Sequence, residues 1–246
     1  TLTITVNARP QVTAGSNVTT TFSRADSSSA FSASGGTGAL TLSMTNTRAQ
    51  ITFDANTGIV YVDSTLAAGT YYETITVTDS LGETATSMVT ILVNAAIQIT
   101  NIGPVRTTFG FARTSAIFTS QYGTSAKTYS ISGLRAGVTV DSSTGRVTVD
   151  SAVPVGTYYE SLTATDALGV STAINITIIV ADTVVLTGGS NISTTRGVAR
   201  SSIAFQGQNG TETITYTLSN PPTGISIDSR TGVVTVASSI STSGTI

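Results

Sequence analysis

The chain has 246 residues, a formal net charge of −2 and no histidine or cysteine. Only 10% of its residues are charged, and it has no basic cluster of the kind that contacts nucleic-acid phosphates. The composition therefore argues against a nucleic-acid partner, and the missing His and Cys exclude Ser-His-Asp and Cys-His catalysis and the usual zinc sites.

The composition favours β-structure. The chain contains 49 Thr and 32 Ser but a single lysine, Lys127. Thr, Val, Ile and Tyr are strand formers, so we expect essentially no helix. The longest apolar region, residues 173–186, is interrupted by polar residues and is shorter than the ~20 apolar residues that span a bilayer. No charged and then apolar leader precedes it at the N-terminus, so the compartment has to be inferred from the class of protein.

The sequence repeats itself every 87 residues without an insertion. The segments DANTGIVYVD, DSSTGRVTVD and DSRTGVVTVA begin at Asp54, Asp141 and Asp228, which are 87 residues apart each time. A fixed period of this kind is typical of an array of similar units. We expect the last strand of a preceding repeat at 1–8, complete repeats at 9–95 and 96–182, and a repeat truncated at its C-terminus at 183–246.

The first residues carry the pattern of a closing strand. Leu2, Ile4 and Val6 alternate with polar residues, and Val6 falls one period before Val93. We therefore expect the chain to start within one domain and to end within another, as a window on a longer repetitive protein. A self-contained subunit that borrows a strand from a neighbour is the alternative.

Within a unit, apolar residues recur at every second position. Ile174, Ile176, Ile178 and Val180 share one face of an extended segment, as in a half-buried strand. The second unit gives about seven such segments, near 97–102, 105–109, 114–120, 127–132, 138–150, 157–165 and 171–180. This number and spacing predict an all-β tandem array of antiparallel, immunoglobulin-like two-sheet sandwiches.

The repeated DxxTG motif has a local explanation as a hairpin turn. The aspartate carboxylate accepts hydrogen bonds from the amides of the turn that follows it, and the glycine supplies a positive φ. The turn positions are Asp54, Gly58, Asp141, Gly145, Asp228 and Gly232.

The run from VTVDSSTGRVTVD through GTYYESLTATDALG resembles known repeats. It is similar to the cadherin-like and immunoglobulin-like repeats of bacterial and archaeal surface proteins, especially the dystroglycan-type repeats with DxxTG followed by GTYxxxxxATD. The resemblance covers both complete units and the first two thirds of the third. It implies an exported chain that serves as a stalk, an adhesin or a surface-layer component.

Metal binding is not expected. Cadherins use several acidic residues to bind calcium between domains, whereas the linkers 92–100 and 179–187 offer one carboxylate, Asp182. Asp79 and Asp166 match the aspartate of the ATD segment, and we interpret each as a turn cap. The sequence therefore indicates no metal and no other cofactor.

Two glutamates stand at positions that alternation directs into the sandwich. Glu73 and Glu160 each fall in a GTYYE segment, and a buried, unpaired carboxylate is costly. One hypothesis pairs Glu160 with Arg113, and Glu73 with Arg24, across the sandwich. The alternative is that each glutamate lies at the wet rim of its strand or is turned outward by a bulge.

Two sets of exposed residues are candidate contacts with other molecules. Tyr72 and Tyr159 are expected on the outer sheet face, where tyrosine stacks on sugars, covers a polar sheet or packs on a neighbouring chain. The N-glycosylation pattern occurs at four asparagines, a number that chance accounts for. They are Asn17, Asn175, Asn191 and Asn209.

The function that fits these features is structural rather than enzymatic. We expect a repeat segment of a long cell-surface or extracellular protein, whose partners are its neighbouring repeats and other copies of the same protein. The alternative is a recognition module that binds glycans or surface proteins through its exposed sheet faces. Positions outside the core differ between units, such as Ile59 and Arg146, and this difference favours the spacer.

Overall fold

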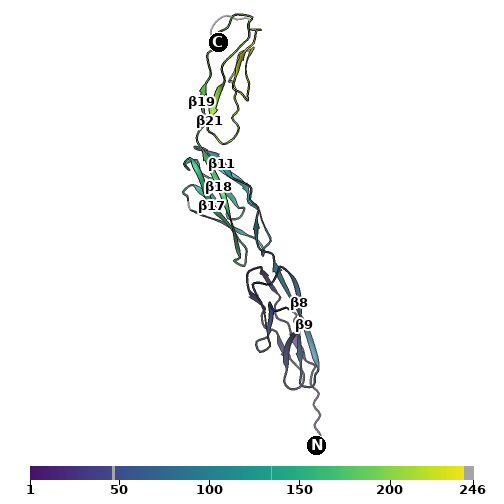
Figure 1. Cartoon of the computed structure of the whole chain (residues 1–246). Coiled ribbons are helices and arrows are strands. Elements are labelled where there is room, and N and C mark those ends of the chain that lie inside the picture. The colour runs from purple at the N-terminus through teal and green to yellow at the C-terminus, as the bar shows by residue number, and fades with distance from the viewer. Residues whose placement is uncertain (46–47, 134, 241–246) are drawn as a thin grey trace.

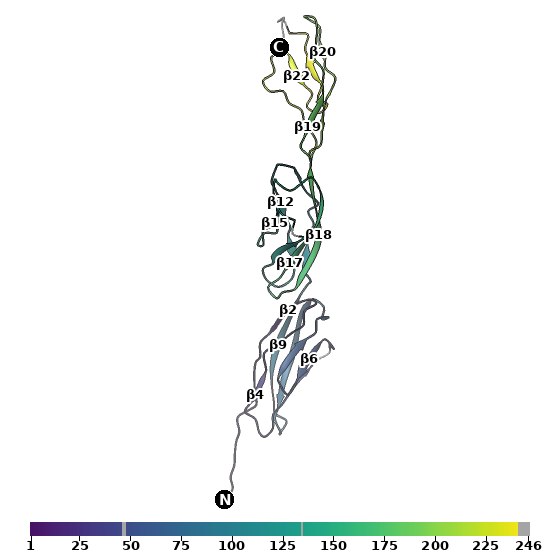
Figure 2. The same cartoon turned by 90° about the vertical axis from the view of Figure 1, so that its left-hand side faces the viewer.

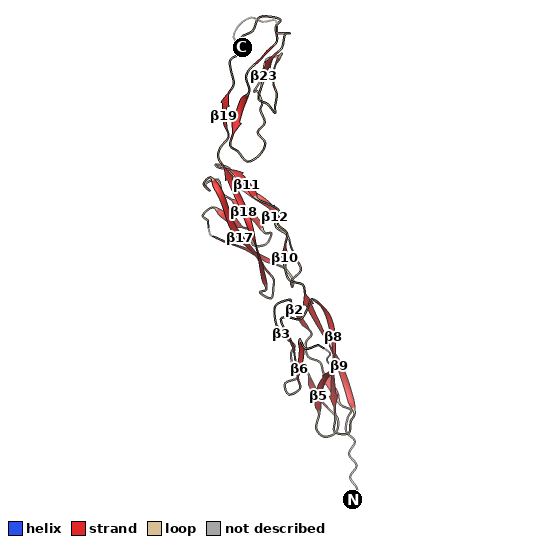
Figure 3. Cartoon of the chain, viewed as in Figure 1, coloured by secondary structure: helices blue, strands red, loops and turns tan. Residues whose placement is uncertain are grey.

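The computed structural model describes residues 1–45, 48–133 and 135–240. Every regular element in these ranges is a β-strand (Figure 3). The strands form three bodies that follow one another along an extended rod, and the two perpendicular views agree on this arrangement (Figure 1 and Figure 2). The predicted all-β tandem fold is confirmed.

In its described residues, the first unit contains nine strands, seven of which form two main sheets. They are β1 (Gln11–Thr13), β2 (Val18–Thr21), β3 (Asp26–Ser27), β4 (Ser32–Ser34), β5 (Thr41–Thr45), β6 (Ile51–Asp54), β7 (Ile59–Val62), β8 (Gly69–Thr78) and β9 (Thr84–Asn94). One sheet has the order β2-β9-β8-β5 and the other the order β3-β7-β6, while β1 pairs with β4. The 87-residue period thus corresponds to a two-sheet sandwich.

The second unit repeats this topology strand for strand. Its strands are β10 (Gln98–Ile99), β11 (Val105–Thr108), β12 (Arg113–Ile117), β13 (Ser120–Gln121), β14 (Thr128–Ser132), β15 (Val138–Val140), β16 (Arg146–Val149), β17 (Gly156–Thr165) and β18 (Ser171–Ala181). The count exceeds seven partly because the segment predicted at 114–120 divides into β12 and β13, with a register irregularity between Thr114 and Ile117.

The core of each complete unit lies between its sheets. Along β17 and β18 the inward residues Leu162, Ala164, Ile176, Ile178 and Val180 are buried. Their neighbours on the same strands are more exposed, because successive side chains of a strand point to opposite faces. The period-two pattern in the sequence is therefore the pattern of the core.

One strand pair in each of the two complete units is parallel, a detail that the predicted antiparallel sandwich did not include. Strand β2 runs beside β9 with Val18 opposite Ile91 and Thr21 opposite Asn94, and β11 runs beside β18 in the same way. The chain first pairs β1 with β4 and then crosses to the other sheet through Gly15, where a Cβ would lie 2.4 Å from the Ser29 carbonyl oxygen. The crossing sends β2 in the direction of the closing strand.

The third unit contains five strands in the described residues. They are β19 (Val185–Gly188), β20 (Arg200–Ser201), β21 (Phe205–Gln208), β22 (Ile225–Ile227) and β23 (Val234–Val236). Strand β19 pairs with β21, and β20-β23-β22 form a second sheet. Both buried core clusters that the structure describes lie in the first two units.

Residues 1–8 form no strand in the structure. Val6 is 90% exposed, whereas Val93, one period later, is 3% exposed in β9. An isolated strand has no ladder partner for its amides and carbonyls, so the extended segment does not by itself become a strand. The unit boundaries drawn from the sequence, including the strand at 1–8, remain predictions.

Two neighbouring isoleucines in β18 test which face of this strand points into the core. Ile178 is fully buried, whereas Ile179 on the outer face of β18 is only half-buried. We expect Ile178→Ala to lower the free energy of unfolding of the second unit by about 2–5 kcal/mol, because it leaves a cavity in the core. Ile179→Ala is expected to cost no more than about 1 kcal/mol. Equal losses in urea unfolding would contradict the assignment.

Candidate functional site: turn motif, outer sheet face and repeat junction

The aspartate of the repeated motif caps its turn in all three units. In the second unit, Asp141 Oδ1 accepts hydrogen bonds from the amides of Ser143 (2.9 Å) and Thr144 (2.8 Å) and from the Ser143 hydroxyl (2.7 Å). Asp54 and Asp228 accept equivalent amide hydrogen bonds two and three residues on. The motif is thus one structural element used three times.

The glycine of the motif is required by both its conformation and its surroundings. Gly58, Gly145 and Gly232 have φ values of 70°, 70° and 68°. A Cβ at Gly58 would lie 2.0 Å from the carbonyl oxygen of Phe31, and at Gly232 it would lie 2.5 Å from that of Phe205. The turn therefore packs against a phenylalanine-bearing segment of its own unit, which explains its repetition without a ligand.

These turns lower the pKa values of their aspartate carboxyl groups. The Ser143 hydroxyl and then the Thr144 amide stabilise the charged form and lower the pKa of Asp141 to about 2. The Asn56 amide lowers the pKa of Asp54, and the Thr231 amide lowers that of Asp228. Each turn is therefore strongest with its carboxylate ionised.

The pH dependence of the Asp141 turn follows from this shift. Its pKa of about 2 in the folded chain is below the ordinary value of 3.8. The stabilisation is therefore complete above the unfolded value and is lost as the pH falls through the folded one. A carbon-13 NMR titration should place the Asp141 carboxyl midpoint near 2, and Ser143→Ala should raise it. A midpoint near 3.8 in the folded chain would contradict the account.

The two glutamates are buried, but the structure forms neither of the hypothesised ion pairs. Arg24 instead pairs through Nη1 with Oδ2 of Asp26, which lies only two residues away. Arg113 is exposed on β12, where its guanidinium stays hydrated and avoids the cost of burial. Among the described residues, Glu160 Oε2 has no hydrogen-bond partner.

The Glu160 carboxylate occupies space that is available because residue 133 is a glycine and has no side chain. A Cβ built on Gly133 would lie 1.6 Å from Glu160 Oε2. The position one period earlier, residue 46, lies outside the described residues. The Glu160 carboxylate therefore packs against bare backbone instead of reaching a cation.

An arginine–tyrosine contact recurs one period apart and was not anticipated from the sequence. The guanidinium carbon of Arg48 lies 4.8 Å from the Tyr71 ring centroid, and that of Arg135 lies 3.8 Å from the Tyr158 centroid. The hydroxyl of each tyrosine donates to a backbone carbonyl four residues earlier. These tyrosines anchor the start of β8 and β17 from inside the unit.

The next tyrosine in each segment faces solvent. Tyr72 is 64% exposed opposite Thr90, and Tyr159 is 75% exposed opposite Thr177.

All four asparagines of the glycosylation pattern are also exposed. Asn17 Oδ1 accepts from the Thr90 amide at 2.9 Å, and Asn209 Nδ2 donates to the Thr183 carbonyl at 3.3 Å. Modification of these asparagines remains a prediction.

The junctions between units are built from a backbone contact that occurs three times. The amide of Gly36 donates to the Ala8 carbonyl (2.8 Å), that of Gly123 to the Ala95 carbonyl (2.9 Å), and that of Gly210 to the Asp182 carbonyl (3.0 Å). Each of these glycines has a positive φ. Each linker is therefore held by the unit that follows it.

Side chains of the first and second units meet at the junction that follows β9. Asn94 Nδ2 donates to Thr124 Oγ1 at 2.8 Å, the hydroxyls of Thr124 and Thr21 are 2.8 Å apart, and Thr21 Oγ1 donates to Asp166 Oδ2 at 2.6 Å. Because a hydroxyl has one proton and the Thr21 proton goes to the carboxylate, Thr124 is the donor to Thr21. The four residues form a one-way relay across the junction.

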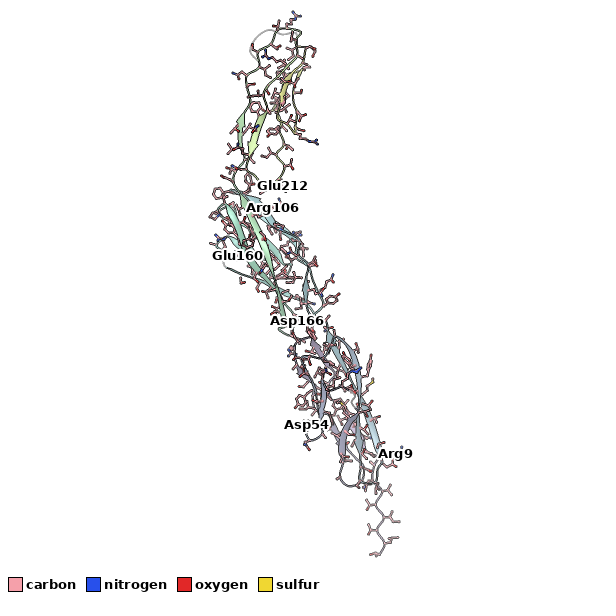
Figure 4. The ribbon with its side chains drawn as sticks, in the orientation of Figure 1. Arg9, Asp54, Arg106, Glu160, Asp166 and Glu212 are labelled. Atoms are coloured by element: carbon pink, nitrogen blue, oxygen red, sulfur yellow. The ribbon has the colours of Figure 1, made fainter. Side chains whose placement is uncertain are left out.

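Asp166 is the acceptor on which this relay ends. It is 5% exposed and lies where the second unit meets the first (Figure 4). Its Oδ1 accepts from the amides of Leu168 (2.9 Å) and Val170 (3.0 Å), and its Oδ2 accepts from the Thr124 amide (2.9 Å). Burial alone raises the pKa of Asp166, but the hydrogen bonds from Thr21 and the amides hold it below its ordinary value.

The second junction has a smaller side-chain network. The hydroxyls of Thr108 and Thr211, one period after Thr21 and Thr124, are 3.4 Å apart. Ala181 stands in the place of Asn94 and has no side-chain amide to donate. Figure 4 labels Arg106 and Glu212 at this junction. The two junctions thus share a backbone contact and differ in their side chains.

Sequence reasoning placed Asp166 in a turn and missed its role between units. The aspartate does cap its loop, but the Thr21 hydroxyl lies 145 residues away in the chain. A signal was present in the sequence, since Thr21 recurs as Thr108 and Asn94 has its counterpart in Asn7. Polar residues that recur one period apart at the ends of strands therefore indicate where two units contact each other.

Loss of one hydroxyl should loosen the first junction. Thr21→Val keeps the shape of a fully buried side chain but removes the donor to Asp166. We expect a loss of about 1.5–3 kcal/mol in the coupling between the two units, because the bond has a charged acceptor. Urea unfolding of the tandem measures this loss. Thr19→Val, on the exposed side of the same strand, is the control, and an equal effect of both variants would contradict the role of Thr21.

No family model and no curated protein sequence matches the chain. Among solved structures, immunoglobulin domains 1–5 of Sidekick-1 superpose with a TM-score of 0.52 and 11% identity, over 95% of this chain and 54% of that one. A mutated three-domain immunoglobulin fragment of titin superposes with a TM-score of 0.50 and 12% identity, over 95% of this chain and 90% of the fragment. The chain thus spans about half the length of the Sidekick-1 structure.

A third solved structure, three repeats of mouse cadherin-23, covers 93% of this chain at 15% identity with a TM-score of 0.37. At these levels of identity the comparisons show the fold, which is a tandem array of immunoglobulin-like sandwiches. Within the described residues, no helix is long and apolar enough to cross a membrane, and no group of three or more acidic side chains is placed to hold a metal ion.

Proposed function

We propose that the chain is a tension-bearing spacer in a long extracellular or cell-surface protein, such as a stalk, a fibre, an adhesin or a surface-layer component. The observation that carries this proposal is the parallel pairing of β2 with β9 and of β11 with β18. The second strand follows the entry of the chain into a unit, and the last strand is its exit. These two strands are therefore the ones that a pulling force loads.

Parallel neighbours resist such a force in shear. A pull on the two ends of a unit draws β2 and β9 in opposite directions along their common axis, so that the ladder from Val18 to Thr21 is loaded as a whole. In an antiparallel hairpin loaded at its open end, the hydrogen bonds would instead break one after another. The rod-like order of the units transmits the load from one to the next (Figure 1).

The proposed spacer continues through residues 1–8 as the closing strand of a preceding unit. Asn7 Nδ2 donates to Thr37 Oγ1 at 3.0 Å, one period before the 2.8 Å bond from Asn94 to Thr124. The Ala8 carbonyl is bound by Gly36 as the Ala95 carbonyl is bound by Gly123. The segment therefore enters the first unit in the same way as β9 enters the second.

A second candidate function is recognition of a glycan or a surface protein by the outer sheet face. It is favoured by the exposure of Tyr72 and Tyr159 at equivalent positions. Tyrosine is enriched in binding surfaces because it combines apolar area with a polar tip. Tyr72→Ala and Tyr159→Ala together would abolish such binding on a glycan array and leave unfolding unaffected.

Single-molecule pulling tests the spacer. Val18 packs β2 against the core, and Leu42 does so for β5, which lies outside the parallel pair. Both Val18→Ala and Leu42→Ala should lower thermal stability, but only Val18→Ala should lower the rupture force of the first unit. Rupture without a distinct force peak, or an equal fall in force for both variants, would overturn the proposal.

A further inference from the structure

The N-terminal end of the first unit resembles the end of the second unit that contacts the first. Thr37 and Asp79 lie one period before Thr124 and Asp166. The Thr37 amide donates to Asp79 Oδ2 at 2.9 Å, the same distance as from the Thr124 amide to Asp166 Oδ2. We call the surface formed by Asn7, Gly36, Thr37 and Asp79 the receiving face.

The receiving face is held in place by the first unit alone. Asp79 is buried, and its Oδ1 accepts from the amides of Leu81 and Glu83, both at 2.9 Å. Gly36 has a φ of 70°, and a Cβ there would lie 2.9 Å from Asp79 Cβ. Gly123 has the same relation to Asp166, where a Cβ would lie 3.2 Å from Oδ2. The carboxylate is thus positioned before any neighbour is bound.

The hydrogen-bond chemistry of this face selects its partner. The Thr37 hydroxyl accepts from Asn7 and keeps its single proton to donate, while Asp79 Oδ2 is an acceptor. A group bound between them has to accept one hydrogen bond and donate another. An aliphatic hydroxyl does both, whereas an ammonium group only donates and a carboxylate only accepts. At the next junction that hydroxyl belongs to Thr21.

We propose that the receiving face docks the end of another immunoglobulin-like repeat, whose threonine hydroxyl bridges Thr37 and Asp79. The inference rests on the proposed spacer function. It adds that each repeat recognises its neighbour through the threonine hydroxyl at the end of that neighbour. The partners in the first junction are separated by 103 residues (Thr21 to Thr124) and by 145 residues (Thr21 to Asp166). A repeat placed one period upstream would present its threonine at these separations from Thr37 and Asp79.

The single carboxylate of Asp79 does not make the receiving face a calcium site. Calcium takes six to eight oxygen ligands, and no group of three or more acidic side chains is placed for a metal within the described residues. The other acidic residue of this loop, Glu83, is exposed. A neutral hydroxyl from a neighbouring repeat is therefore the occupant that the geometry favours.

Insertion of one extra repeat tests the proposal. A copy of residues 9–95 placed after Ala8 puts its Thr21 at 145 residues before Asp79, as in the natural first junction. We expect amide hydrogen exchange at Thr37 to slow by about tenfold relative to the 246-residue chain, because docking restricts the opening of this loop. Thr21→Val in the inserted copy should abolish the slowing, and Thr21→Ser should retain it.

The controls separate docking from folding of the inserted repeat. Thr19→Val in the copy should leave Thr37 exchange slow, since Thr19 is exposed on the same strand. A second insert, a copy of residues 96–182 that presents Thr108, should slow exchange as well. Unchanged exchange at Thr37 with either insert folded would overturn the docking rule. Pulling of the same chains reports the spacer separately, because the rupture force of the first unit depends on its own parallel pair.

Discussion

The parallel pairing between the second and the last strand of each complete unit is the constraint on which the rest of the structure depends. It closes the four-stranded sheet, and it sets the entry strand beside the exit strand along the axis of the rod. The same register places Thr21 beside Asn94 at the end of the ladder. Both residues of this last pair reach the next unit, so the closing of one sandwich creates the contact for its neighbour.

At the first junction, only four side chains form a contact whose hydrogen bonds all run in one direction. The amide of Asn94, the hydroxyls of Thr124 and Thr21 and the carboxylate of Asp166 each use a different donor or acceptor capacity. The partly buried setting strengthens such a network but makes an incomplete one costly. A relay of this kind therefore favours one orientation between units, whereas an apolar contact of similar size would tolerate several.

The sequence predicted the all-β tandem fold and its period because alternation at Ile176 and Ile178, and the recurrence of Asp141, are local patterns. It did not predict the parallel pair, because residues 14–17, which precede β2, contain no pattern that indicates the sheet in which β2 pairs. The ion pair between Glu160 and Arg113 failed for a related reason. Alternation indicates which face a side chain takes, but only the fold shows that Gly133, not arginine, lies against the carboxylate.

The relative orientation of the first two units tests the central claim most directly. Residual dipolar couplings measured on the 246-residue chain report the alignment of the first unit and of the second unit separately. A relay-bound junction predicts that one alignment tensor fits both units, with the ends of β2 and β9 directed at Asp166. Two tensors of different magnitude, with the second unit averaged over many orientations, would contradict it.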